Sequence, residues 1–120
     1  MRYFYLYHFG GVYLDLDQLC LRELELTPLL PGTATFGYID RGINCSRGEC
    51  IRSNNEAVPN AFMAAPPRHP FFAYLIKQLP ETRDRLFRGH KLSHPNAATG
   101  PSFLTRALVD WWRYKVAALL

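Results

Sequence analysis

Two aspartates, Asp15 and Asp17, stand two positions apart at the end of a short apolar run in the segment GGVYLDLD, residues 10–17. Side chains alternate across a β-strand, so on a strand both carboxylates would lie on one face. Two neighbouring carboxylates repel each other when both are ionised, unless a cation or hydrogen-bond donors lie between them. A divalent metal ion is the simplest such partner, and we therefore expect a metal site at Asp15 and Asp17.

The segments on either side of this pair predict how it is positioned. Residues 2–9 are mostly aromatic or leucine, which favours a buried helix, and Gly10-Gly11 supplies a left-handed stop at its end. Residues 12–16 are β-branched, aromatic and leucine, which predicts a strand. A strand that ends in Asp-Leu-Asp is leaving the core for a surface cleft, where open α/β sheets bind their ligands.

Further strands and helices are predicted downstream. Residues 33–39 and 60–65 have the composition of strands, whereas residues 40–59 have no clear period and predict a long loop. A helix is expected to begin at Pro70 and to end at Pro80, because proline suits the first position of a helix and breaks its interior. This mixture of strands and helices favours an α/β or α+β sheet.

The carboxy-terminal third is predicted to be mainly helical. Residues 81–88 predict a charged, exposed turn of helix, residues 89–98 a polar loop, and Thr99-Gly100-Pro101 the start of a last helix. Each of the two long helices has one apolar face at helical spacing. These faces comprise Phe71, Phe72, Leu75, Ile76 and Leu79 on the first, and Phe103, Leu104, Ala107, Leu108 and Trp111 on the last.

Composition predicts a single globular domain. The chain has 120 residues, is 48% hydrophobic and carries a net charge of +4. Its basic residues are spread out, and the one dense group, Arg83, Arg85 and Arg88, favours a solvated helix face over a nucleic-acid surface. The positive excess suits an anionic ligand such as a diphosphate. No apolar run is long enough to span a membrane, and no signal peptide is recognisable.

Cysteine and histidine residues point to no separate site. The three cysteines are Cys20, Cys45 and Cys50, so at least one is unpaired. Cys45 and Cys50 are close enough to bridge in an oxidising compartment, and whether they do stays open. Their spacing does not match a zinc site. The histidines are expected to pack, cap a helix or be solvated: His8, His69, His90 and His94.

The segment RYFYLYHFGGVYLDLDQLCLRELE, residues 2–25, resembles the sugar-binding region of glycosyltransferases with a DXD motif. The nearest resemblance is to family 32, which includes α-1,6-mannosyltransferases and mannosyltransferases that act on inositol phosphorylceramide. Two later pieces match in the expected order: NAFMAA at residues 60–65 followed by His69-Pro70-Phe71, and Thr99-Gly100-Pro101 before a helix.

The resemblance implies a GT-A fold, a nucleotide-sugar donor, a divalent cation that is usually Mn²⁺, and transfer with retention of the anomeric configuration. It assigns Asp17 to direct metal binding and Asp15 to donor ribose or sugar hydroxyls, with both carboxylates as candidate metal ligands. Arg2 and Tyr13 match positions that contact the donor, and Asn60 matches an asparagine near the sugar and metal. No catalytic residue is assigned.

The resemblance also implies partners and a location. GDP-mannose or a UDP-sugar is the expected donor, and a glycan or a sphingolipid is the expected acceptor, with mannose the favoured sugar. No nucleic acid is expected. The relatives in this family work at the Golgi membrane or in its lumen, so a Golgi location is implied for this chain.

We expect residues 1–120 to form one partial glycosyltransferase domain of the α/β class that lacks the amino-terminal nucleotide-binding half. Its parts are the DXD region at residues 2–25, the loop at 40–59 and the carboxy-terminal helices at 70–120. Such a chain is expected to have weak activity or none. Two alternatives stay open: a catalytically inactive remnant of a glycosyltransferase, and a metal-binding module unrelated to sugars.

Overall fold

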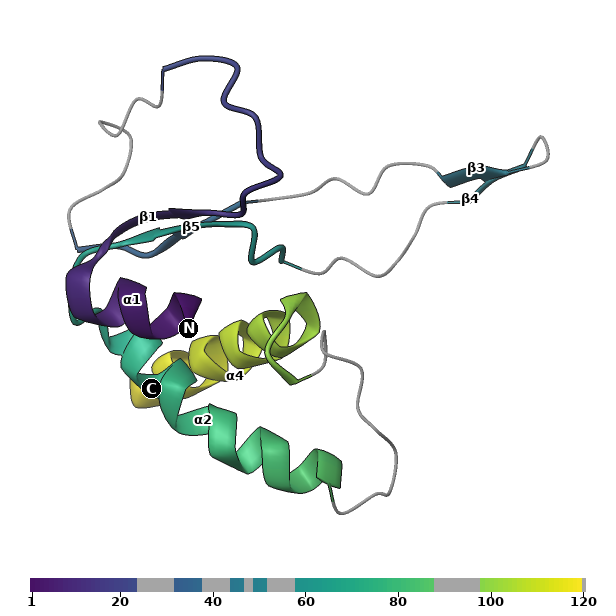
Figure 1. Ribbon diagram of the computed structural model, residues 1–120. Helices are drawn as coiled ribbons and strands as arrows, with labels where there is room; N and C mark the ends of the chain where they lie inside the picture. Colours follow the sequence, from purple (N-terminus) through teal and green to yellow (C-terminus); the bar gives the residue numbers. More distant parts are fainter. Residues whose placement is uncertain (24–31, 38–43, 47–48, 52–57, 88–97, 120) are drawn as a thin grey trace.

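The computed structural model describes residues 1–23, 32–37, 44–46, 49–51, 58–87 and 98–119. In these parts, helices cover one side of a three-stranded antiparallel sheet (Figure 1). This confirms a domain of mixed helices and strands. The strand pairings described are all antiparallel, so they match the α+β alternative better than a parallel α/β sheet.

The first helix and strand form as their sequence predicts. Helix α1 runs over Arg2–Phe9 and buries Tyr3 and Leu6, which lie three residues apart and therefore share one face. Gly10 ends the helix at a φ of 67°, and its amide donates a 2.9 Å hydrogen bond to the Leu6 carbonyl. Strand β1, Gly11–Leu14, then returns along the sheet.

The sheet has strand β5 at its centre, between β1 and β2. Strand β5 comprises Phe62–Ala65, and β2 comprises Thr35–Phe36, shorter than the strand predicted for residues 33–39. Met63 of β5 is fully buried and lies in register with Tyr13 on one neighbour and Phe36 on the other. Successive side chains alternate between faces, so this row of three points to the side that carries the buried core.

Two long helices close the core below the sheet. Helix α2 runs over Pro70–Phe87, and helix α4 runs over Pro101–Leu119. His69 caps α2, because its Nδ1 accepts a 3.2 Å hydrogen bond from the amide of Phe71. The core combines residues of all these helices with the sheet: Tyr3, Leu6, Met63, Ala65, Phe71, Phe72, Leu75, Phe103, Leu104 and Ala107.

The predicted end of α2 at Pro80 is wrong, because the helix continues through that residue to Phe87. Proline removes one helical hydrogen bond and disturbs the preceding turn, a local cost of about 3 kcal/mol. Packing beyond the proline opposes this cost, since Thr82 is buried and lines a small cavity together with Phe103 and Ala107 of α4.

The loop predicted for residues 40–59 is wrong in part, because it contains a hairpin. Strands β3, Asn44–Ser46, and β4, Glu49–Ile51, pair antiparallel and contact no other described element. Backbone register places Cys45 opposite Cys50. Residues 40–43, 47–48 and 52–57 of that loop, and residues 89–97 of the loop predicted at 89–98, lie outside the described residues.

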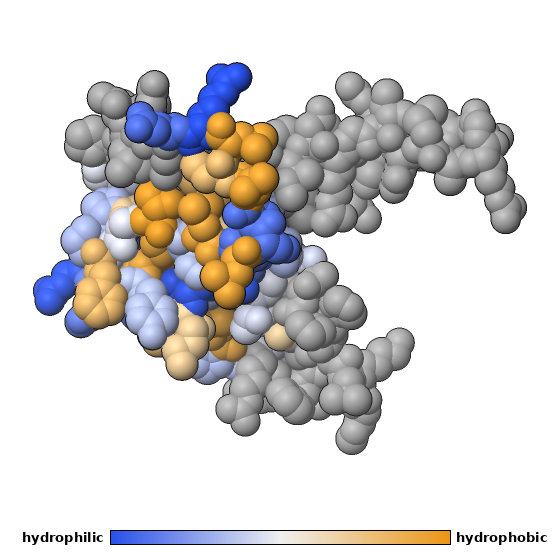
Figure 2. Space-filling view, turned by 45° about the horizontal axis from the view of Figure 1, so that its top comes forward, coloured by the Kyte–Doolittle hydropathy of each residue, from blue (hydrophilic) through white to orange (hydrophobic). Residues whose placement is uncertain are grey.

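Apolar residues also reach the surface. Figure 2 shows a group of them on one face, among strongly hydrophilic neighbours. Leu16, Leu19 and Leu21, which follow β1, are more than four-fifths exposed. A search of the helices in the described ranges finds none that is both long and apolar enough to cross a membrane.

Gly10 offers a test of the reversal between α1 and β1. A Cβ at this position would lie 2.5 Å from the Pro67 nitrogen, and its φ is one that side chains rarely adopt. Gly11 also has a positive φ, but a Cβ there would meet open space. Gly10→Ala should therefore lower the free energy of unfolding by at least about 2 kcal/mol, the sum of strain and overpacking. Urea denaturation measures this loss.

Gly11→Ala is the matched control, because it brings backbone strain alone, about 1–2 kcal/mol. Equal losses in the two variants would contradict the close approach of Pro67 to Gly10.

Candidate functional site

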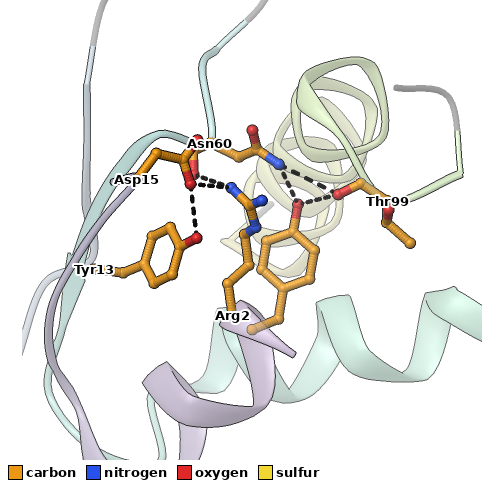
Figure 3. A network of polar contacts seen from close by, with 6 residues as sticks. Arg2, Tyr13, Asp15, Asn60 and Thr99 are labelled. Atoms are coloured by element: carbon orange, nitrogen blue, oxygen red, sulfur yellow. Dashed lines mark hydrogen bonds and ion pairs between the residues drawn. The ribbon is translucent and has the colours of Figure 1, made fainter. Parts of the chain in front are cut away.

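The side chain of Arg2 joins the start of α1 to the end of β1. Its Nη1 lies 2.8 Å from Oδ1 of Asp15 and donates a second hydrogen bond, 3.0 Å long, to the main-chain carbonyl of Asn60 (Figure 3). The side chains of Arg2 and Asp15 are 31% and 29% exposed, so the ion pair lies at the surface of the domain. Within the described residues the contacts of Arg2 use Nη1, which leaves Nη2 available to an anionic ligand.

Tyr13 adds a second donor to the same carboxylate oxygen. Its hydroxyl donates a 2.7 Å hydrogen bond to Oδ1 of Asp15, and the Arg2 guanidinium lies 4.9 Å from the centre of its ring. The hydrogen bond to Asp15 stabilises the protonated phenol and, with burial, raises the pKa of Tyr13. Asp15 is therefore held in one orientation by a cation and a phenol.

Asn60 lies behind this ion pair and connects it to the start of α4. Its Nδ2 lies 3.3 Å from the Tyr3 hydroxyl and 3.3 Å from the Thr99 carbonyl, and Tyr3 itself donates a 2.7 Å hydrogen bond to that carbonyl (Figure 3). Asn60 and Tyr3 are both buried, and burial raises the pKa of Tyr3. No polar side-chain atom buried in the described part lacks a hydrogen-bond partner. Tyr3, Asn60 and Thr99 thus form a hydrogen-bonded network next to Arg2.

Asp17 takes no part in the hydrogen bonds described for Arg2, Tyr13, Asp15 and Asn60. The expectation that Asp15 and Asp17 share one face of a strand is wrong, because β1 ends at Leu14 and the chain turns. In this turn the amide of Gln18 donates a 3.1 Å hydrogen bond to the Asp15 carbonyl. Asp17 is exposed in the turn, and the described residues offer its carboxylate no hydrogen bond or ion pair.

The backbone explains why the strand stops there. The Asp15 amide still donates a 2.9 Å hydrogen bond to the Ala61 carbonyl, one step past the last strand pair, Leu14 with Phe62. Asp15 is thereby tied to the segment that carries Asn60. Asp17 lies in the turn that follows and is exposed.

The donor set suits a hard cation. Mn²⁺ and Mg²⁺ prefer carboxylate, carbonyl and water oxygens, and the two aspartates are the carboxylates of this turn. The described residues contain no group of three or more His, Cys, Asp or Glu that could hold a metal alone. A cation bound by Asp17, with or without Asp15, would therefore complete its ligands from water and a bound anion.

The structure brings together four of the five residues selected from the sequence: Arg2, Tyr13, Asp15 and Asn60. The sequence analysis missed Tyr3 and Thr99 as polar partners. Tyr3 was assigned to an aromatic helix face, and Thr99 to a helix start. The Thr-Gly-Pro motif predicted the start of a helix. Thr99 contributes its main-chain carbonyl to the network, and the type of a residue does not reveal such a contact.

The pKa of Tyr13 provides a direct test of the hydrogen bond to Asp15. Asp15→Asn removes the negative charge that favours the protonated phenol, so the pKa of Tyr13 should fall toward its ordinary value. A titration followed by NMR of ring-labelled tyrosine measures the change. The pKa of Tyr3, raised mainly by burial, should stay raised in the same sample.

Asp17→Asn is the matched control, since Asp17 is the weakest of the influences on Tyr13. A Tyr13 pKa that is unchanged in Asp15→Asn would contradict the geometry of this site.

Tyr3→Phe tests the hydrogen bonds of the Tyr3 hydroxyl. The change removes a hydroxyl that bonds both Asn60 and Thr99, and should lower the free energy of unfolding by about 1–2 kcal/mol. Tyr5→Phe is the control on the same helix, because Tyr5 is 57% exposed. Urea denaturation should separate the two variants, and equal stabilities would show that the Tyr3 hydroxyl contributes nothing.

Part of the chain matches a known protein family. Residues 1–36 match the family described as the glycosyltransferase sugar-binding region containing a DXD motif. The matched region includes Arg2, Tyr13 and both aspartates.

Three relatives extend the similarity beyond that region. Mannosyl phosphorylinositol ceramide synthase CSH1 of Saccharomyces cerevisiae is 33% identical over 115 residues, 96% of this chain and 25% of the relative. Mannosyl phosphorylinositol ceramide synthase SUR1 of the same yeast is 35% identical, with the same coverage of 96% and 25%. Inositol phosphoceramide mannosyltransferase 1 of Schizosaccharomyces pombe is 33% identical over 109 residues, 87% of this chain and 27% of the relative.

The chain thus spans about a quarter of the length of these curated relatives. Over that quarter the similarity includes the DXD region, the sheet and both long helices. The chain therefore belongs to the glycosyltransferase enzyme family of the family 32 type, which carries the DXD sugar-binding region.

Proposed function

We propose that this chain forms the donor-binding centre of a metal-dependent glycosyltransferase of the GT-A type. The enzyme would transfer mannose, with retention, from a nucleotide sugar to a sphingolipid acceptor. The observation that supports this most strongly is the convergence of Arg2 and Tyr13 on one oxygen atom of Asp15, with Arg2 also bonded to the main-chain carbonyl of Asn60. Helix α1, the end of β1 and the segment before β5 each contribute to this group, and the side chains of Arg2 and Asp15 are 31% and 29% exposed.

The residues of the site have different parts in binding the donor. Asp15, oriented by Arg2 and Tyr13, has its Oδ2 free of described contacts and can accept a hydrogen bond from a ribose or sugar hydroxyl. Arg2 can donate from Nη2 to a phosphate oxygen, a charge-assisted bond of the strong kind. The side-chain amide of Asn60 already bonds Tyr3 and Thr99, so the proposed part of Asn60 is to hold the site in place.

Asp17 is the residue best placed to bind the cation. Its carboxylate has no described partner to displace, whereas that of Asp15 is already neutralised by Arg2. A bound Mn²⁺ would supply a Lewis acid that neutralises the charge of the departing diphosphate. Asp15 is proposed as a second, weaker contributor to the cation site.

The names of the relatives support the donor and the acceptor that we propose. Their names include mannosyltransferases of inositol phosphoceramide, which favours mannose and hence GDP-mannose over a UDP-sugar. The same names favour a sphingolipid over a glycan acceptor. A Golgi location, expected from the resemblance, is part of this proposal.

Calorimetric titration tests the site without requiring turnover. MnCl₂, GDP, and GDP in the presence of MnCl₂ are titrated into the 120-residue chain. Mn²⁺ should strengthen GDP binding, and Asp17→Asn should reduce this enhancement at least about tenfold, because it replaces a charged oxygen ligand by a neutral amide.

Asp110→Asn is the matched control, because Asp110 is an exposed carboxylate on α4 outside the polar network. Manganese affinity that is indifferent to GDP would instead support the metal-binding module unrelated to sugars. Full GDP and Mn²⁺ binding by Asp17→Asn would contradict the proposed role of this residue.

A further inference from the structure

Helix α4 carries an apolar stripe that the described residues leave uncovered. Val109, Trp112, Val116 and Leu119 recur at alternating intervals of three and four residues, so they share one side of the helix. Their exposed fractions are 45% at Val109, 67% at Trp112, 47% at Val116 and 86% at Leu119. We call these four residues the α4 stripe. It is separate from the core-facing side of the helix, which contributes Phe103, Leu104 and Ala107.

Positive charge borders the stripe on both flanks. Successive residues of a helix are rotated by about 100°, which places Arg113 on one flank and Lys115 on the other. Both side chains are exposed, and Lys115 is placed by a cation–π contact, with its Nζ 5.0 Å from the Trp111 ring. Asp110, the acidic residue of α4, lines a cavity on the side of the helix that faces α2.

The apolar surface continues from the stripe into a hollow of the domain. A cavity of about 590 Å³ lies between β2 and α4, and Val109, Trp112 and Arg113 form part of its wall. Phe36 and Leu108 contribute further apolar surface to it. The stripe is thus the outer edge of a wider apolar area with cations at its border.

We propose that the α4 stripe binds the surface of a lipid bilayer that contains anionic lipids. In this arrangement the four apolar side chains enter the interface, and Arg113 and Lys115 bind lipid phosphates. A helix with one apolar side and basic flanks is suited to lie in the plane of the interface, and tryptophan favours the headgroup region. The inference is independent of the proposed transfer activity.

Charge favours a bilayer over a second copy of this chain. Pairing two stripes would bring the Arg113 and Lys115 side chains of both copies toward one apolar seam, where like charges repel. An anionic surface instead attracts each of them, and a basic residue near such a surface strengthens binding about fivefold.

Vesicle flotation tests the proposal. The 120-residue chain is mixed with vesicles of phosphatidylcholine alone, or of phosphatidylcholine and phosphatidylserine in equal parts. It should float with the anionic vesicles and release as salt rises. The double variant Arg113→Gln with Lys115→Gln should bind about 25-fold more weakly, and Trp112→Ser should bind more weakly at every salt concentration.

Two controls match these variants. Lys77→Gln removes an exposed cation from α2, and Phe9→Ser removes an apolar side chain that is 68% exposed on α1. Both should bind vesicles like the unmodified chain, and circular dichroism should show the same helix content for every variant.

Three outcomes would overturn the proposal. One is no flotation with anionic vesicles, and another is equal loss in the control and stripe variants. The third is sedimentation of a dimer that Trp112→Ser dissociates, without vesicle binding, which would make the stripe a contact between copies.

Discussion

The ion pair between Arg2 and Asp15 exists because the chain reverses its direction at Gly10. The two residues are thirteen positions apart, and a continuous helix or strand would keep their side chains far from each other. The reversal instead places α1 against the helix side of the sheet, with its first turn beside the end of β1. The reversal requires a glycine at position 10, because Pro67 occupies the space that a side chain there would need. The geometry of the polar site is therefore set at a residue that takes no part in it.

The geometry of the polar site also depends on the contact between the sheet and the start of α4. Asn60 precedes β5, and its buried amide bonds Tyr3 and the Thr99 carbonyl. A buried amide without partners would be costly, so the three groups hold one another in place. Val58 strengthens the same junction, since its amide donates a 2.8 Å hydrogen bond to the Thr105 hydroxyl. The segment before β5 is thus bonded to Thr99, just before α4, and to Thr105 within it.

Much of this architecture could be predicted from residue patterns. The aromatic run before Gly10-Gly11 indicated α1, and the apolar spacing after Pro70 and Pro101 indicated the faces of α2 and α4. The prediction failed at Pro80, where tertiary packing outweighs a local preference, and at Asp17, where the strand ends earlier than its composition suggests. The site residues Arg2, Tyr13, Asp15 and Asn60 were selected from a family resemblance. Their convergence depends on main-chain carbonyls and on Tyr3, which a pattern of side-chain types does not reveal.

The Tyr3 hydroxyl has a consequence for the order of events during synthesis. Its hydrogen bond to Thr99 joins residues that are 96 positions apart in the chain. Contacts of such long sequence separation form only after the intervening chain has been made and closed into a loop. On the ribosome, α1 and the DXD segment are made before Thr99, whose main-chain carbonyl accepts hydrogen bonds from Tyr3 and Asn60. Until then the Tyr3 hydroxyl lacks its acceptor, and the hydrogen bonds around Asn60 are incomplete.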